Sequence, residues 1–257
     1  MLVLKDKLVF VHVPKTGGSF VRSLCNISHL VSKTRWYLGQ SHVPIGSEEA
    51  KDPLRKKVSL PSFCVVRNPL DWYFSFYKFE LREHSTRGYA LYSDHLKDRY
   101  GEKGAFHAWL YEWLEHGMHY KERSQDEIWG MMKDVNLDLG RYSYIHSFLT
   151  CSKLPKTVEE YDDHLLIDHV CRLENLVDDL KSLFEEYELE VDWNTIIEKS
   201  PRNERPDKKP LDYLEWYTPD LVNLVQEKDS ILCEKYYPNF PSPIYMSRKK
   251  WEWKFQR

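Results

Sequence analysis

The sequence predicts an α/β fold in which a central parallel sheet is flanked by helices. Two segments, residues 7–28 and 60–84, each have the pattern of an apolar strand, a turn and a helix. A third strand and helix are expected at residues 166–187, and a last helix at about 218–236. Strands that alternate with helices are typical of parallel sheets, and no linker interrupts the 257 residues. A single domain spanning residues 1–257 is therefore expected.

The first strand, residues 7–13, is apolar on both faces, as is expected of a central strand covered by helices. The turn after it contains two glycines, which can direct successive backbone N–H groups toward one point. The helix at 18–28 adds its own unbonded N–H groups, while a lysine adds a mobile charge and two residues add hydroxyls. The turn therefore predicts a phosphate site formed by Lys15, Thr16, Gly17, Gly18, Ser19 and Phe20.

The turn differs from the Walker A motif of nucleoside triphosphatases. In that motif the lysine follows the last glycine, whereas Lys15 precedes Gly17 and Gly18. The sequence also has no apolar strand that ends in an aspartate suited to hold magnesium. The sheet is expected to be P-loop-like, and the alternative is a plain strand–turn–helix corner in which glycines only allow the bend.

The second strand–helix segment places an arginine at the carboxyl end of a strand. The strand at 60–66 ends before Arg67, and Asn68 and Pro69 are favourable residues for a helix start. Ligands of open α/β sheets bind outside the carboxyl ends of the strands, where the planar guanidinium can bind a phosphate. Ser75 lies two turns into the helix and can add a hydroxyl to the same anion.

The remaining elements are expected to be a short strand at 34–38 and helices at 102–118 and 124–134, while 142–149 is ambiguous. Aromatic residues make up 14% of the chain and cluster between Trp72 and Tyr144. Most of them are expected to pack in a core, although such rings could also stack on an acceptor. Residues at about 80–160 are therefore expected to form a helical, aromatic-rich insertion that binds the acceptor.

Residues 14–19 (PKTGGS) resemble the 5′-phosphosulfate loop of sulfotransferases, and Arg67 with Ser75 resembles their 3′-phosphate motif. The sequence PKTGG is similar to the branch that contains the Golgi carbohydrate sulfotransferases, including the heparan and uronyl 2-O-sulfotransferases, and bacterial relatives. Weaker similarity is found at 167–180 and 217–236. The resemblance implies transfer of the sulfuryl group of PAPS (3′-phosphoadenosine-5′-phosphosulfate) to a hydroxyl, or less readily an amine, of a carbohydrate or small molecule. PAP is released, and no metal is required.

Sulfuryl transfer needs stabilisation of the leaving phosphate and a base for the acceptor proton. Lys15 is expected to provide the first. His42 is expected to be the base, because the resemblance implies a catalytic histidine in a Gly-His-x-Pro-like segment after the short strand. Here two additional residues separate Gly39 from His42. Glu80 and Glu83 are the alternatives, since some relatives use a carboxylate.

A loop near residue 200 is also implied by the resemblance, because family members close such a loop over the cofactor near its 3′-phosphate. The expected contacts from this loop are Arg202, Asn203 and Arg205. His107, His116 and His119 could be suggested as metal ligands. Gly117 interrupts their helix, so no metal site is expected.

Composition and charge narrow the function further. A net charge of −3 argues against a dedicated nucleic-acid-binding protein. The longest early apolar run, residues 8–13, is far short of the roughly 20 residues that cross a bilayer. Five cysteines without a C-x-x-C pair are typical of reduced thiols in a cytoplasmic protein. The alternatives to a sulfotransferase are an ATP-dependent kinase on the same fold and a non-catalytic nucleotide-binding protein.

Overall fold

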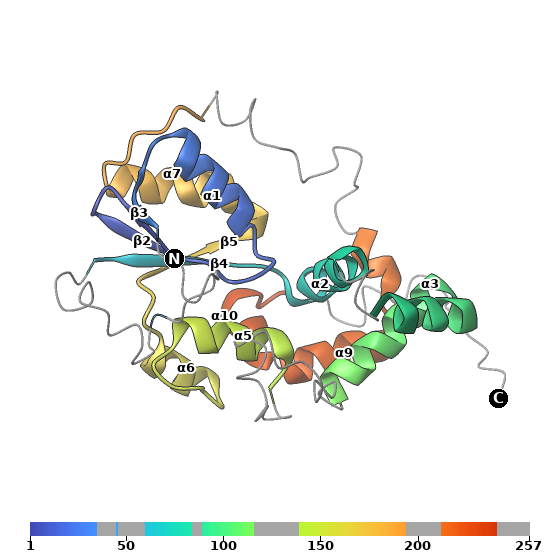
Figure 1. The fold of residues 1–257 in the computed structure, drawn as a ribbon. Helices are drawn as coiled ribbons and strands as arrows, with labels where there is room; N and C mark the ends of the chain where they lie inside the picture. Colours follow the sequence, from blue (N-terminus) through green and yellow to red (C-terminus); the bar gives the residue numbers. More distant parts are fainter. Residues whose placement is uncertain (35–44, 46–59, 84–88, 116–138, 194–211, 241–257) are drawn as a thin grey trace.

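The computed structural model describes residues 1–34, 45, 60–83, 89–115, 139–193 and 212–240 (Figure 1). It is an α/β structure built on a five-stranded sheet with the order β3-β1-β2-β4-β5. The strands are β1 (Leu2–Leu4), β2 (Leu8–Val11), β3 (Val31–Thr34), β4 (Ser62–Val66) and β5 (His169–Arg172). The helices are α1 (Gly18–Ile27), α2 (Pro69–Glu83), α3 (Tyr89–Glu115), α5 (Arg141–Thr150), α6 (Val158–His164), α7 (Leu176–Glu186), α9 (Pro219–Lys228) and α10 (Ser230–Tyr236).

The sheet is mixed, which corrects the expectation of a wholly parallel one. β2, β4 and β5 are parallel to one another, but β1 is antiparallel to both β2 and β3. β1 and β2 form a hairpin whose turn residues Lys5 and Asp6 have φ angles of 43° and 54°. Tight hairpin turns use such positive φ angles and usually contain glycine or asparagine. Asp6 tolerates such an angle, but no glycine or asparagine accompanies it, so the sequence signal for this hairpin is weak.

Helices cover both faces of the sheet. Figure 1 shows α1 and α7 on one face, with α5, α6 and α10 on the other. The α7 helix buries Leu176, Leu180, Leu183 and Phe184, the spacing of one apolar stripe. These side chains and those of α1 pack with Phe10 and Phe63 from the sheet. All five cysteines are buried and free.

Aromatic side chains form the core on the second face, as expected for most of them. Trp72 lies between Tyr142 and Phe76, stacked on them with ring centres 4.6 Å and 5.0 Å away. Trp109 and Trp113 of α3 continue the cluster and are each only 5% exposed. The cluster joins α2, α3 and α5 into one packed layer.

Several element boundaries differ from the expectation. β3 begins at Val31, three residues before the expected strand, and 35–44 lie outside the described residues. Gly101, with φ 70° and ψ 174°, interrupts α3, so the part after this break begins at 102 as expected, whereas the part from Tyr89 to residue 100 was not expected. The segment 142–149 is helical, whereas 124–134 lies outside the described residues. The last helix is divided at Asp229 into α9 and α10, and the Thr218 hydroxyl caps α9 by accepting a hydrogen bond from the Leu221 N–H.

The α5 helix receives its N-terminal cap from other elements. Asp229 accepts hydrogen bonds from the Ser143 N–H and from the Tyr73 hydroxyl, both at 2.7 Å. The Tyr73 oxygen in turn accepts from the Tyr142 N–H at 3.3 Å. A side chain at Gly140, the residue before the helix, would place its Cβ 2.4 Å from the Asp229 carboxylate. Burial of this carboxylate raises the pKa of Asp229 to about 6.

Candidate functional site

The candidate site lies where the carboxyl ends of the three parallel strands meet. Val11 of β2 is level with Cys64 of β4, and Val66 of β4 is level with Arg172 of β5. The segments that leave these strands are therefore neighbours at one edge of the sheet. In α/β proteins this edge is where ligands bind.

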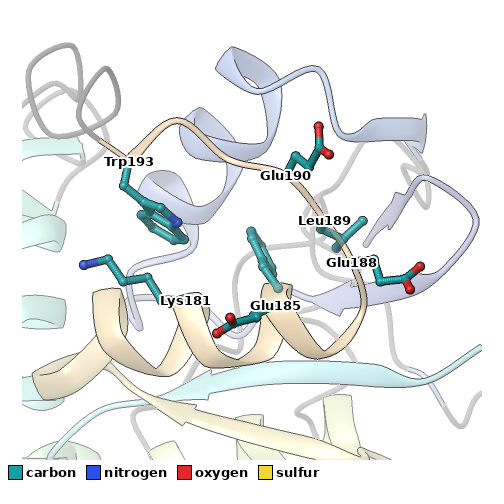
Figure 2. Close-up of a pocket in the computed structure, with 7 residues that line it drawn as sticks. Lys181, Glu185, Glu188, Leu189, Glu190 and Trp193 are labelled. Atoms are coloured by element: carbon teal, nitrogen blue, oxygen red, sulfur yellow. The ribbon is translucent and has the colours of Figure 1, made fainter.

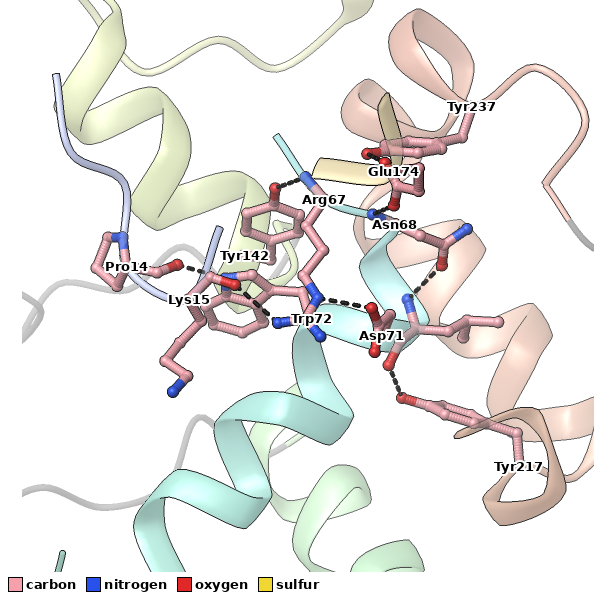
Figure 3. Close-up of polar contacts among 11 residues, drawn as sticks. Pro14, Lys15, Arg67, Asn68, Asp71, Trp72, Tyr142, Glu174, Tyr217 and Tyr237 are labelled. Carbon is pink, nitrogen blue, oxygen red and sulfur yellow. Dashed lines mark hydrogen bonds and ion pairs between the residues drawn. The ribbon is translucent and has the colours of Figure 1, made fainter. Parts of the chain in front are cut away.

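Three successive carbonyl groups of the β2–α1 turn are bound by side-chain donors, two of which are drawn in Figure 3. The carbonyl oxygens of Val13, Pro14 and Lys15 accept hydrogen bonds of 2.9, 2.8 and 2.9 Å from the Thr16 hydroxyl, the Trp72 indole and the Arg67 guanidinium, respectively. Lys15 and Gly17 have left-handed φ angles of 65° and 88°. The turn therefore has a defined shape that side chains from α2 and the end of β4 hold in place.

The N–H groups of the same turn are left without acceptors. Within the described chain, no hydrogen bond uses the backbone N–H of Thr16, Gly17, Gly18 or Ser19 as its donor. Two of these groups belong to the first turn of α1, whose N–H groups have no acceptor within the helix. Consecutive N–H groups at a helix N-terminus attract an anion. The turn thus has the chemistry of an anion site.

The neighbouring α2 helix differs, because side chains accept hydrogen bonds from two N–H groups at its N-terminus. The Asn68 N–H donates to the Glu174 carboxylate at 2.7 Å, and the Leu70 N–H donates to the Asn68 side-chain oxygen at 3.0 Å. The expectation that Asn68 caps this helix is confirmed. Within the described residues, the start of α1 therefore presents a longer run of consecutive unbonded N–H groups than the start of α2, where Pro69 has no N–H and the Leu70 N–H is bound.

Arg67, the residue after β4, connects this strand to the β2–α1 turn. Its Nε donates to Asp71 at 2.7 Å and its Nη1 donates to the Lys15 carbonyl at 2.9 Å. Its backbone N–H donates to the Tyr142 hydroxyl at 2.8 Å. Its Nη2 group has no hydrogen-bond partner among the described residues, and the side chain is 17% exposed. One edge of the guanidinium is therefore still able to bind an anion.

One side of α2 contacts both Arg67, through Asp71, and Lys15, through Phe79. The Lys15 amino group lies 4.4 Å from the centre of the Phe79 ring. Asp71, Ser75 and Phe79 follow one another at intervals of four residues, so they lie on one side of the helix. Ser75 is thus placed between the two contacts. The structure brings Lys15 and Arg67 together, although they are distant in the sequence, and it places Ser75 on the same side of α2 as Asp71 and Phe79.

The other predicted residues of the turn differ in their surroundings. Thr16 is fully buried and its hydroxyl is used within the turn, so only its N–H remains for a ligand. Ser19 is exposed, whereas Phe20 packs on the core between α1 and α7. The ring of His12 lies against Gly18 and stacks on Phe10.

The close contact between Gly18 and His12 allows a direct test. A Cβ at Gly18 would lie 1.9 Å from two ring atoms of His12. Gly18→Ala is therefore expected to lower the free energy of unfolding by about 1–3 kcal/mol, measured by urea denaturation. Adding His12→Ala should recover part of the loss, because it removes the ring. Losses that simply add in the double variant would contradict the contact.

Several expected site residues cannot be placed. His42, Arg202, Asn203 and Arg205 lie outside the described residues, as do His116 and His119. Glu80 and Glu83 belong to α2, but their side chains are not described. His107 bonds through Nε2 to the Trp216 carbonyl at 2.7 Å. In the described part of the chain, no three His, Cys, Asp or Glu side chains are grouped as metal ligands.

Four residues of the site were not predicted as such, namely Asp71, Trp72, Tyr142 and Glu174. The spacing of four between Arg67 and Asp71 is the one signal the sequence offered for them. By itself, Asp71 indicates only a favourable charge in the first turn of a helix. The other three reach the site through tertiary packing, which no local pattern encodes.

A separate pocket of about 520 Å³ lies beside α7 (Figure 2). It contains none of the predicted site residues. Three carboxylates in its lining make it unfavourable for an anion. The lining residues are Lys181, Phe184, Glu185, Glu188, Leu189, Glu190 and Trp193.

Comparison of the chain with protein-family models, with curated proteins and with solved structures gave no match. Among the helices that the structure describes, none combines the length and apolarity needed to span a membrane. Its function is accordingly inferred from its own residues.

Proposed function

We propose that this chain is a PAPS-dependent sulfotransferase that transfers a sulfuryl group to a hydroxyl of a carbohydrate or small molecule and releases PAP. The observation that carries the proposal is the set of unbonded N–H groups at Thr16, Gly17, Gly18 and Ser19. They lie beside Arg67, whose Nη1 contacts the carbonyl of the same turn. Two anion-binding groups at neighbouring strand ends suit a nucleotide that is anionic at both ends.

The two ends of PAPS would use different groups. The N–H groups of the turn and the Lys15 amino group would hold the 5′-phosphosulfate. The Nη2 group of Arg67 and the Ser75 hydroxyl would hold the 3′-phosphate. The start of α1 at the turn and the position of Ser75 on α2 support this division.

In the reaction, the acceptor oxygen forms a bond to sulfur while the bond from sulfur to the 5′-phosphate oxygen breaks. The electron pair of that bond goes to the phosphate, and the acceptor proton goes to a base, for which His42 is proposed on the sequence resemblance. The turn N–H groups and Lys15 would stabilise the charge that develops on the leaving phosphate. Fixed N–H dipoles need no reorganisation to do so.

Binding of PAP without metal tests the proposal. Calorimetry in EDTA is expected to give micromolar or tighter affinity, because protein groups alone meet both phosphate ends. Tighter binding of ATP with magnesium would instead favour a kinase. PAP binding without transfer from radiolabelled PAPS, across a panel of carbohydrate and small-molecule acceptors, would favour a non-catalytic nucleotide-binding protein.

A further inference from the structure

The direction of one N–H group in the turn depends on Arg67. The Lys15 carbonyl and the Thr16 N–H belong to the same planar peptide group and therefore point in opposite directions. The Arg67 Nη1 holds that carbonyl at 2.9 Å. Arg67 thereby makes the Thr16 N–H point away from the guanidinium. This N–H is the first of the four in the turn that have no acceptor among the described residues.

The backbone conformation at Lys15 needs a stabilising contact such as the hydrogen bond from Arg67. Its φ of 65° is left-handed, which is uncommon for a residue with a side chain and persists where neighbouring groups enforce it. Thr16 and Trp72 fix the two preceding carbonyls, and Arg67 contacts the carbonyl of Lys15. Loss of Arg67 would release the peptide group that follows the strained residue.

Asp71 determines where the guanidinium lies. Its carboxylate accepts from Arg67 Nε at 2.7 Å, and the two side chains are only 17% and 24% exposed. Asp71 belongs to the first turn of α2, which is itself held by Glu174 at Asn68 and by the Tyr217 hydroxyl at the Leu70 carbonyl (Figure 3). A charge-assisted bond from a fixed helix orients the arginine more firmly than solvent would.

We infer that Asp71 is a positioning residue of the anion site: it orients Arg67, and Arg67 holds the Lys15 carbonyl so that the N–H groups of the turn face the ligand. Arg67 therefore serves both ends of the nucleotide, the 3′-phosphate directly and the 5′ end through the turn. The statement about ligand affinity rests on the proposed function, whereas the statement about the shape of the turn does not.

The two possible roles of Asp71 give opposite results for PAP. If Asp71 acted only through its charge, Asp71→Asn would strengthen PAP binding, because a carboxylate near the 3′-phosphate repels it. If Asp71 positions Arg67, the same substitution weakens PAP binding despite the loss of that repulsion. Asparagine is nearly isosteric with aspartate, so the fold is kept.

The experiment uses Asp71→Asn and Arg67→Ala, with Asp162→Asn as the matched control. Asp162 also pairs with a basic side chain, Lys235, at 2.6 Å, but on α6 and α10. Affinities for PAP and for adenosine 5′-phosphosulfate, which lacks the 3′-phosphate, are measured by calorimetry. The amide resonances of Thr16, Gly17 and Gly18 are followed by NMR in the unliganded proteins.

We expect both variants at the site to shift the three amide resonances and to weaken adenosine 5′-phosphosulfate roughly tenfold or more, the usual effect of losing one charged hydrogen bond. PAP should weaken as well, and Asp162→Asn should change neither measurement. Unchanged resonances, with adenosine 5′-phosphosulfate affinity retained in Arg67→Ala, would overturn the inference. Should the natural protein not bind PAP at all, the proposed function fails, and the resonances alone decide whether Asp71 and Arg67 position the turn.

Discussion

The His42→Ala variant is expected to turn over roughly 10²–10⁴ times more slowly than the natural protein while binding PAP with nearly unchanged affinity. The physical reason is that the proposed base takes a proton from the acceptor and does not contact the nucleotide phosphates. Steady-state kinetics with an acceptor found by the radiolabelled PAPS screen, together with calorimetry for PAP, measure the two effects. The acidic limb of the pH profile, which reports a histidine that must be neutral, should disappear in the variant.

Lys15→Ala is the matched comparison, because Lys15 is proposed to stabilise the leaving phosphate. That variant should lose both turnover and PAP affinity. The contrast between the two variants separates a proton acceptor from a group that binds charge. Near-normal turnover of His42→Ala would rule out His42 as the base, and Glu80 and Glu83 would then be substituted next.

The second large effect concerns the buried carboxylate that caps α5. Burial raises the pKa of Asp229 from its ordinary 3.8 to about 6, so the folded state binds more protons than the unfolded state between these values. The contribution of Asp229 to the free energy of unfolding therefore falls as the pH rises. Relative to Asp229→Asn, the natural protein should lose about 2 kcal/mol of stability between pH 4.5 and pH 7.

Urea denaturation of both proteins across this pH range gives the difference directly. Groups that titrate elsewhere cancel in the comparison, because both proteins contain them. The asparagine side chain of the variant cannot ionise, so its own contribution stays constant with pH. Parallel stability curves for the two proteins would show that Asp229 does not change its protonation on folding in this range.

Local sequence patterns predicted the strand–turn–helix units well. The apolar strand before Lys15, the glycine turn and the Asn68-Pro69 helix start each reflect short-range physics, and each has its counterpart in the structure. The neighbouring positions of Lys15, Arg67 and Ser75 followed from the rule that parallel strands share a carboxyl edge. Whether these residues bind PAPS stays a prediction.

The elements that were missed depend on long-range contacts. The β1–β2 hairpin has an atypical turn at Lys5 and Asp6, which strand pairing and hydrogen bonds to the distant residues Leu30 and Ser32 stabilise. The segment that forms α5 was ambiguous because Gly140, the residue before it, has no side chain to cap a helix. The roles of Asp71 and Trp72 at the turn likewise require the packed tertiary structure, which brings distant backbone carbonyls within their reach.

The N-terminal cap of α5, which residues of other elements supply, also has a consequence for the order of folding. The groups that satisfy its first N–H groups, Tyr73 and Asp229, are separated from Tyr142 and Ser143 by 69 and 86 residues, respectively. Closing chain loops of this length is slow compared with forming a helix that carries its own signals. The α5 segment therefore gains its stability late, after α2 and the α9–α10 junction have come together. We therefore expect the hydrogen bond between the Arg67 N–H and the Tyr142 hydroxyl to form only after α5 has been capped.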